Sequence, residues 1–341
     1  MDLSAPTHDT ARVLVEDASQ VSAARRLAAR LAQALHFDEV TGGRLALAVT
    51  EAATNLLKHA GRGEILLGPA RANGHAVAEV LVLDRGPGMV NVDRCFQDGY
   101  STAGSAGTGL GALRRISNTC EVYSRPGGTA LLMRVGPADA TPAAAAGPTD
   151  VAGLSVAVAG EEQCGDAWDQ EPQAGGVALL VVDGLGHGAG AADAARECVR
   201  AFRRHGGASP AARVTALHQA LRATRGAALA VAEIDIAGQT VRFAGLGNIA
   251  ATVYGPRSVR HLVSHHGIAG HAAQRITEYT YPWPPGAALV MHSDGVATLR
   301  DLEPYPGLMQ RDPGIIAGVL YRDFGRTRDD ATVVVARGPA A

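Results

Sequence analysis

Apolar residues recur at helical spacing in two stretches near the start of the chain. Leu27, Leu31 and Leu35 lie four residues apart within 21–35, and a second apolar stripe runs through 45–56. Residues three or four apart share one face of a helix, so each stretch predicts an amphipathic helix. Ser19 is positioned to cap the first of them. Shorter apolar runs, which are typical of β-strands, follow at residues 64–67, 77–83 and 129–135.

The second half of the chain has strand-like runs on both sides of two helical stretches. The helical stretches span 189–205 and 210–224. The strand-like runs cover 154–159, 176–182, 227–236, 240–247, 250–255, 288–293 and 331–337. This order predicts β-sheets with helices packed outside them. For the first half, helices followed by strands predict α+β layers rather than a parallel βαβ fold.

A segment of small residues, prolines and acids lies between the two halves. Residues 137–150, PADATPAAAAGPTD, show no hydrophobic periodicity. Such a composition is typical of a linker. We therefore expect one domain over residues 10–136 and a second over residues 151–337.

Composition narrows the possible partners. Of the 341 residues 47% are hydrophobic, which is enough to build two cores, and the net charge is −2. Without a long basic run, neither a nucleic acid nor an anionic membrane is an expected partner. We find no signal peptide and no apolar run long enough to span a membrane. The four cysteines are scattered without a CxxC pair, so we expect reduced thiols and a cytoplasmic location.

Three short motifs in the first half bear on chemistry. Glu51 and Asn55 lie four apart on one face of the second predicted helix. The stretch DRGPGM (84–89) ends an apolar strand with Asp84, and its glycines allow a ligand to approach the backbone. The stretch GTGLG (107–111) precedes the helical run ALRRIS, an arrangement that suits phosphate oxygens. Between them, residues 98–106 are small and polar, as expected of a mobile segment over a ligand.

The order ExxxN, DxGPG, GxGLG resembles the Bergerat-fold (GHKL) ATP-binding domains. Within them it is most similar to the bacterial anti-sigma factors and switch-protein serine kinases, in particular the stressosome type, over residues 10–135. The resemblance implies an α/β sandwich that binds ATP and Mg²⁺. Glu51 would be the general base that takes a proton from a serine hydroxyl. Asn55 would hold Mg²⁺ with the ATP phosphates, Asp84 would bind the adenine amino group with Gly86 and Gly88 around the base, and Gly107, Gly109 and Gly111 would contact the phosphates.

In the second half, acids recur at the ends of predicted strands. The run VVDGLGHG (181–188) places Asp183 directly after an apolar strand, and Asp294 follows another. Asp166 and Asp169 lie in CGDAWD, and Asp329 and Asp330 begin the last strand. A nucleotide loop would need GxGxxG or GxxxxGK[ST], and neither is present here. Oxygen ligands without His or Cys suit Mg²⁺ or Mn²⁺.

The order GD, DGxGHG, SDG, DDxT resembles the metal-dependent serine/threonine phosphatases of the PPM family, in their SpoIIE-like branch, over about residues 155–337. The resemblance implies an α-β-β-α sandwich holding two or more Mn²⁺ or Mg²⁺ ions. Asp183 would bridge two ions, the Gly184 carbonyl would ligate one, and Asp294 and Asp329 would complete the set of ligands around the second ion. Asp166 would bind through water or support a third ion. Family spacing favours Asp329 over Asp330, and His187 would be structural rather than a ligand. A zinc site at His261, His265, His266 and His271 lacks the matching spacing.

The two resemblances together predict a bifunctional regulator of partner switching. The first domain would phosphorylate a serine or threonine of a STAS-domain protein, and the second would remove such phosphates, in a pathway that controls a sigma factor. Two alternatives stay open at this point. The first domain could be an anti-sigma module that binds a sigma factor, or it could sense ATP and gate the phosphatase.

Overall fold

The computed structural model describes residues 10–96, 109–140, 149–273, 275–299 and 302–339. The chain divides into two compact units, residues 1–146 and 147–341, and the boundary falls within the expected linker. The short helix η1 (Ala138–Ala140) and the first residue of strand β6 also lie inside that segment. No helix in the described part of the chain combines the length and the apolar character needed to span a bilayer.

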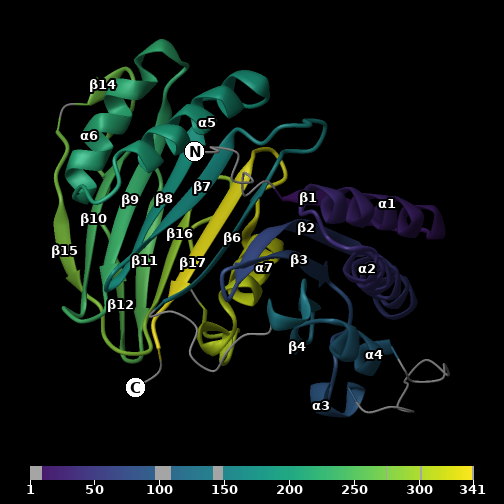
Figure 1. Ribbon diagram of the computed structural model, residues 1–341. Helices are drawn as coiled ribbons and strands as arrows, with labels where there is room; N and C mark the ends of the chain where they lie inside the picture. Colours follow the sequence, from purple (N-terminus) through teal and green to yellow (C-terminus); the bar gives the residue numbers. More distant parts are fainter. Residues whose placement is uncertain (1–9, 97–108, 141–148, 274, 300–301, 340–341) are drawn as a thin grey trace. The chain divides into compact units, whose positions relative to one another are not determined.

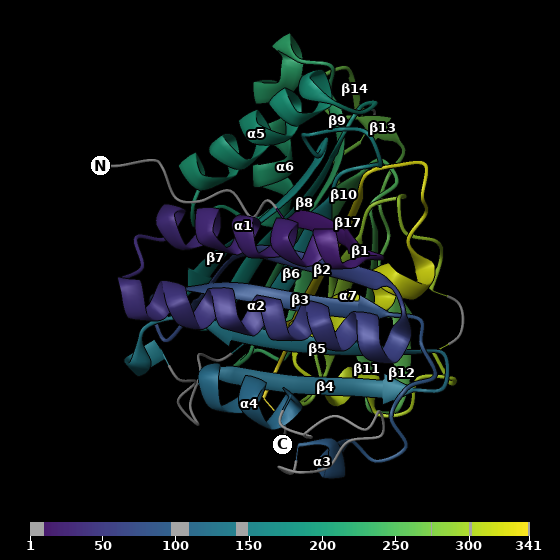
Figure 2. The same cartoon turned by 90° about the vertical axis from the view of Figure 1, so that its right-hand side faces the viewer.

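The first unit is one antiparallel sheet covered by two long helices. Its strands are β1 (Ala11–Val15), β2 (Gly63–Ala72), β3 (His75–Asp84), β4 (Thr119–Arg125) and β5 (Gly128–Val135), in the order β1-β2-β3-β5-β4. The helices are α1 (Ala18–Ala34), α2 (Glu39–Ala60), the short α3 (Val92–Cys95) and α4 (Gly109–Ile116). Figure 2 shows α1 and α2 lying side by side across the same face of the sheet.

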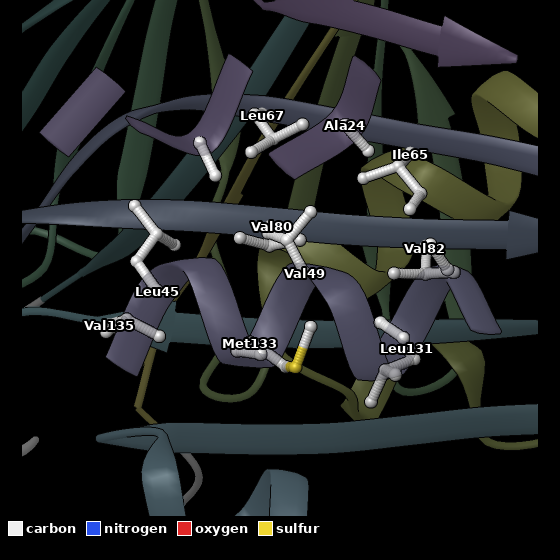
Figure 3. Packing of buried hydrophobic residues seen from close by; sticks show 14 of the residues in the cluster. Ala24, Leu45, Val49, Ile65, Leu67, Val80, Val82, Leu131, Met133 and Val135 are labelled. Atoms are coloured by element: carbon white, nitrogen blue, oxygen red, sulfur yellow. The ribbon is translucent and has the colours of Figure 1, made fainter. Parts of the chain in front are cut away.

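The core of the first unit lies between α2 and this face. Leu45 and Val49 of α2 are fully buried against Val80, Val82 and other strand residues, as Figure 3 shows. Burial of one such side chain stabilises a fold by about 1.5–3 kcal/mol. The helical spacing of the sequence thus corresponds to the face that holds α2 on the sheet.

The cap of the first helix differs from the prediction. Asp17, not Ser19, is the N-cap, and its carboxylate accepts a hydrogen bond from the Ser19 backbone amide at 2.7 Å. Gln20 completes a capping box by bonding back to the Asp17 amide at 2.9 Å. The Ser19 hydroxyl also donates to Asp17, so the Asp17 carboxylate accepts both the amide and the hydroxyl of Ser19.

The second unit is built on two five-stranded antiparallel sheets (Figure 1). One sheet has the order β15-β10-β9-β8-β7, with β7 (Asp166–Gln173), β8 (Gly176–Gly184), β9 (Ala227–Asp235), β10 (Thr240–Leu246) and β15 (Tyr279–Pro282). The other has the order β12-β11-β16-β17-β6, with β6 (Asp150–Val156), β11 (Ala250–Gly255), β12 (Ser258–His261), β16 (Ala288–His292) and β17 (Ala331–Arg337). A two-residue pair, β13 (Gly267–Ile268) and β14 (Ala272–Ala273), stands apart.

Helices cover the outer face of each sheet. Helices α5 (Ala189–Arg204) and α6 (Pro210–Ala220) pack on the first sheet, and α7 (Pro313–Phe324) packs on β17 and β6 of the second. One core cluster joins the inner faces of both sheets, and another joins the first sheet to α5 and α6. The expected α-β-β-α sandwich and the α+β class are therefore confirmed.

Candidate functional site

In the first unit, helix α2 carries the expected acid and amide. Glu51 and Asn55 lie one turn apart and are both partly exposed, whereas Ala52 and Leu56 between and beside them are buried. The same helix thus packs on the sheet with one face and presents these two polar side chains on another. Lys58 lies in the last turn and is exposed.

Asp84 ends β3 and is held in place by backbone donors. Its Oδ1 atom accepts hydrogen bonds from the Gly86 amide at 2.8 Å and from the Thr129 amide at 3.2 Å. The Thr129 hydroxyl shares a 2.8 Å hydrogen bond with Ser124, whose hydroxyl accepts from the Met89 amide. The carboxylate orientation therefore depends on β5 and on the loop that follows β3.

The loop after Asp84 requires a glycine at its fourth residue, Gly88. Gly88 has φ of +78°, and a Cβ there would lie 2.2 Å from the Arg125 carbonyl oxygen. A side chain is thus excluded by both conformation and space. The loop can run against the β4–β5 turn only because this position has no Cβ.

The glycine-rich segment is described only in part. Helix α4 begins at Gly109, three residues before the predicted start, so Gly109 and Gly111 lie in its first turn. The backbone amides of a first helical turn have no partners within the helix and favour anions. Gly107 and the predicted mobile segment 98–106 lie outside the described residues.

In the second unit, three carboxylates line one cavity. Asp183 stands near the end of β8, Asp294 follows β16, and Asp329 precedes β17. The cavity has a volume of about 540 Å³. Its other lining residues are Leu185, Gly186, His187, Ala228, Gly247, Asn248, His266, Gly267, Ile268 and Arg328. The two sheets thus bring together acids that are far apart in the sequence.

Burial and then mutual repulsion raise the pKa values of two acids in this region, Asp183 and Asp166. Burial, followed by the charges of Asp294, Asp329 and Asp330, raises the pKa of Asp183 to about 7. Asp166 lies directly opposite Asp183 in the β7–β8 pairing. Burial, and then the Asp183 charge, raises the pKa of Asp166 well above its usual range. A cation placed among them would relieve this repulsion.

The two adjacent acids before β17 have different surroundings. Asp330 is buried, and its two carboxylate oxygens each accept a 2.7 Å hydrogen bond, from the Val158 and Gly165 amides. Asp329 is exposed to the cavity, and its Oδ1 accepts from the Asp330 amide. Asp330 therefore joins β17 to the segments around β7, while Asp329 presents its carboxylate to the cavity.

Neighbouring residues fix the acids. Asn248 Nδ2 donates to Asp294 Oδ2 at 2.7 Å, and Ser293 Oγ donates to Asp166 Oδ2 at 2.6 Å. At Gly184 a Cβ would lie 2.4 Å from the Ala191 carbonyl oxygen, so only glycine fits there. These partners are not visible in the sequence pattern, because nothing marks which polar side chain faces a given acid.

The residue types suit divalent cations. Within the described ranges, no three His, Cys, Asp or Glu side chains form a group that could hold an ion by themselves. Mg²⁺ retains several waters and needs only one or two carboxylates for each ion. The three carboxylates around this cavity meet that requirement. Soft or imidazole-selecting metals would need thiol or histidine ligands.

The remaining acids and histidines have structural partners. Asp169 is buried and forms a two-bond ion pair with Arg203, at 2.6 and 3.2 Å. His187 Nδ1 lies 2.7 Å from Glu161. Of the histidines weighed for zinc, His261 contacts Thr252, His265 contacts Tyr279, and His271 contacts the Arg225 carbonyl. Among these four histidines, only His266 lines the cavity.

Comparison with known proteins assigns each unit to a family. Residues 14–135 match the histidine kinase-like ATPase domain, and residues 173–339 match stage II sporulation protein E (SpoIIE). The serine/threonine-protein kinase RsbT of Bacillus subtilis (strain 168) is 31% identical over 107 residues, which are 31% of this chain and 80% of that protein.

Two solved structures are similar in fold. One, described as "The bacterial stressosome: a modular system that has been adapted to control secondary messenger signaling", is 26% identical with a TM-score of 0.52, over 55% of this chain and 99% of that one. A crystal structure of RsbX in complex with magnesium is 18% identical with a TM-score of 0.50, over 56% of this chain and 95% of that one. The second likeness concerns the fold alone.

Proposed function

Because this chain belongs, through its first unit, to the histidine kinase-like ATPase family of the kinase RsbT and, through its second, to the SpoIIE phosphatase family, we propose that it adds and removes phosphate on partner-switching proteins. The first unit is an RsbT-like kinase domain and the second is a PPM-type serine/threonine phosphatase domain. The observation that carries the proposal is that one chain has both sets of site residues, Glu51 with Asn55 on one helix and three carboxylates around one cavity.

In the kinase unit the residues of α2 and the loop after β3 would act together on ATP. Asp84, oriented by two backbone amides, would accept the adenine amino group, with Gly86 and Gly88 allowing the base to lie close to the backbone. Asn55 would hold Mg²⁺ and the phosphates, and Gly107, Gly109 and Gly111 would supply amides to them. Glu51 would take the proton of the attacking serine or threonine hydroxyl. Phosphoryl transfer needs mainly this kind of positioning and charge neutralisation.

In the phosphatase unit Asp183, Asp294 and Asp329, with the Gly184 carbonyl, would hold two divalent cations. Asp166 would bind through water or support a third ion. Bound ions lower the pKa of water and neutralise phosphoryl oxygens. Hydrogen bonds orient two of these carboxylates in the protein. Asp294 accepts one from the Asn248 side chain, and Asp329 accepts one from the Asp330 backbone amide. Magnesium is the first ion to test, because the RsbX structure was solved with it.

The partners follow from the relatives. RsbT is a kinase by name and one similar structure is from a stressosome, so we expect the substrates to be STAS-domain proteins of such a system, which in turn control a sigma factor. If both units acted on one residue, ATP would be hydrolysed without effect. We therefore expect different phosphorylation sites, or different proteins, for the two units.

Phosphosite mapping tests this proposal. Candidate STAS proteins are incubated with the chain, ATP and Mg²⁺ or Mn²⁺, and phosphorylated residues are identified by mass spectrometry. Asp183→Asn should leave some sites more highly phosphorylated, and Glu51→Gln should remove others. Asp193→Asn, an exposed acid on α5, is the matched control. A site pattern that neither substitution changes would refute the proposal.

A further inference from the structure

We propose that Arg328 binds the phosphoryl group of the substrate at the phosphatase cavity. The inference rests on the proposed phosphatase function and adds a binding residue to it. Arg328 lines the same cavity as Asp183, Asp294 and Asp329, and it is the one arginine among the lining residues. The ligand would be a phosphomonoester dianion on a serine or threonine.

The backbone on both sides of Arg328 is held in place. The Arg326 amide donates to the Gly295 carbonyl at 2.7 Å, and Gly325 forms a β-bridge with Val296. On the other side, Asp330 is bound to the Val158 and Gly165 amides. The loop is therefore anchored to the segment that carries Asp294. This fixes where the Arg328 side chain emerges, beside the carboxylates, while the side chain itself stays exposed.

The Arg328 guanidinium has no partner within the described residues. No hydrogen bond or ion pair of this side chain is found, even though three carboxylates line the same cavity. Several other arginines of this unit are paired with acids. Arg203 binds Asp169, Arg213 binds Glu171, and Arg322 binds Asp323. The donors of Arg328 are thus available to a ligand in the cavity.

Charge and geometry favour a phosphate as that ligand. The cations expected at the carboxylates would neutralise the negative charge of these acids. A phosphoryl group bound to the cations would still have oxygens that can accept hydrogen bonds. A guanidinium offers a planar fork that binds two phosphoryl oxygens at once. The other basic groups of the lining are imidazoles, and His187 is already paired with Glu161 at 2.7 Å. Arg328 is therefore the side chain best suited to this role.

The test compares Arg328→Ala and Arg328→Lys with Arg326→Ala, an exposed arginine two residues away that does not line the cavity. Two quantities are measured in Mg²⁺: binding of inorganic phosphate by calorimetry, and KM and kcat on a phosphoserine peptide. A charge-assisted pair is lost in Arg328→Ala, so we expect the phosphate Kd and the KM to rise about tenfold or more. Arg328→Lys should recover part of this effect, and Arg326→Ala should stay within about twofold of wild type.

Control measurements separate the possible failures. Binding of Mg²⁺ in the absence of phosphate should be unchanged in Arg328→Ala, which shows that the carboxylates are intact. Unchanged phosphate Kd and KM in Arg328→Ala would overturn the inference, as would an equal rise in Arg326→Ala. If the wild type binds phosphate through Arg328 but hydrolyses no phosphopeptide with Mg²⁺ or Mn²⁺, the inference holds and the proposed phosphatase function fails.

Discussion

Replacement of Asp183 by Asn should make the metal-free second unit more stable. In the native protein the pKa of Asp183 is raised from 3.8 to about 7, by burial first and by the neighbouring carboxylates next. The folded state therefore binds more protons than the unfolded state between about pH 4 and pH 7. In this window the contribution of Asp183 to stability falls as pH rises, and above pH 7 the ionised carboxylate is fully unfavourable.

The size of the effect follows from the shift. About three pKa units, at 1.36 kcal/mol each, correspond to about 4 kcal/mol at pH 8. The pKa values of Asp166 and Asp330 are also raised, so these neighbours share the relief with Asp183 and lower the expected gain to about 2 kcal/mol. Asp183→Asn should thus raise the free energy of unfolding by about 2–4 kcal/mol at pH 8 and by almost nothing near pH 4.

Tryptophan fluorescence provides the assay. The chain has two tryptophans, Trp168 and Trp283, and both are buried in the second unit. Urea unfolding in EDTA, followed by this signal from pH 4 to pH 8, therefore reports on the unit that contains Asp183. In saturating Mg²⁺ the order should reverse, because ligand binding stabilises the wild type and not the variant. Asp193→Asn is the control and should change stability by no more than about 0.5 kcal/mol. A variant that is no more stable than wild type at pH 8 in EDTA would refute the reasoning.

Three further predictions concern individual positions. Gly88→Ala should destabilise the first unit and abolish ATP binding measured by calorimetry. Gly127→Ala is the control, because Gly127 also has a left-handed backbone but no atom lies within 4 Å of a Cβ there. It should lower the free energy of unfolding by only about 1–2 kcal/mol and leave ATP affinity unchanged. Asp84→Asn should weaken ATP binding at least about tenfold without unfolding the unit, because it replaces the proposed carboxylate acceptor of the adenine amino group by an amide. Unchanged affinity by calorimetry would count against that proposed role. Asp329→Asn should lower Mg²⁺ affinity and leave the free energy of unfolding nearly unchanged. Asp330→Asn should lower the free energy of unfolding by about 1–3 kcal/mol, because it loses an acceptor for a buried amide. The reverse pattern would mean that the two residues have exchanged roles.

Much of the fold could be predicted because the apolar spacing matches the faces that are buried. The stripe through 45–56 is the sheet-facing side of α2, and the runs at 176–182 and 331–337 are central strands. Elements without such a pattern were missed. Helix α7 is buried on all sides, so its sequence PGIIAGVLYRDF shows no polar face. Strand β7, DAWDQEPQ, is rich in acids and amides, and two of its carboxylates have buried partners: Asp166 accepts a hydrogen bond from Ser293, and Asp169 pairs with Arg203.

The sequence likewise reveals some residues of the candidate site and not others. Acids at strand ends are visible in the sequence, since an abrupt change from apolar to acidic residues marks them. Their partners are not, since a backbone amide such as that of Thr129 carries no sequence signal, and Asn248 and Ser293 resemble any other polar residue. The separation of Asp329 from Asp330 likewise depends on which carboxylate meets the Val158 and Gly165 amides, which only the fold determines.

Transfer of labelled γ-phosphate from ATP to purified STAS proteins tests the central claim most directly. The chain carries Asp183→Asn, so that the phosphatase unit cannot remove the product, and the comparison is the same chain with Glu51→Gln added. The account predicts a labelled STAS protein in the first case and none in the second, with ATP affinity equal in both. No label on any STAS protein, with ATP still bound, would contradict the kinase and leave phosphate removal as the only catalysis of this chain.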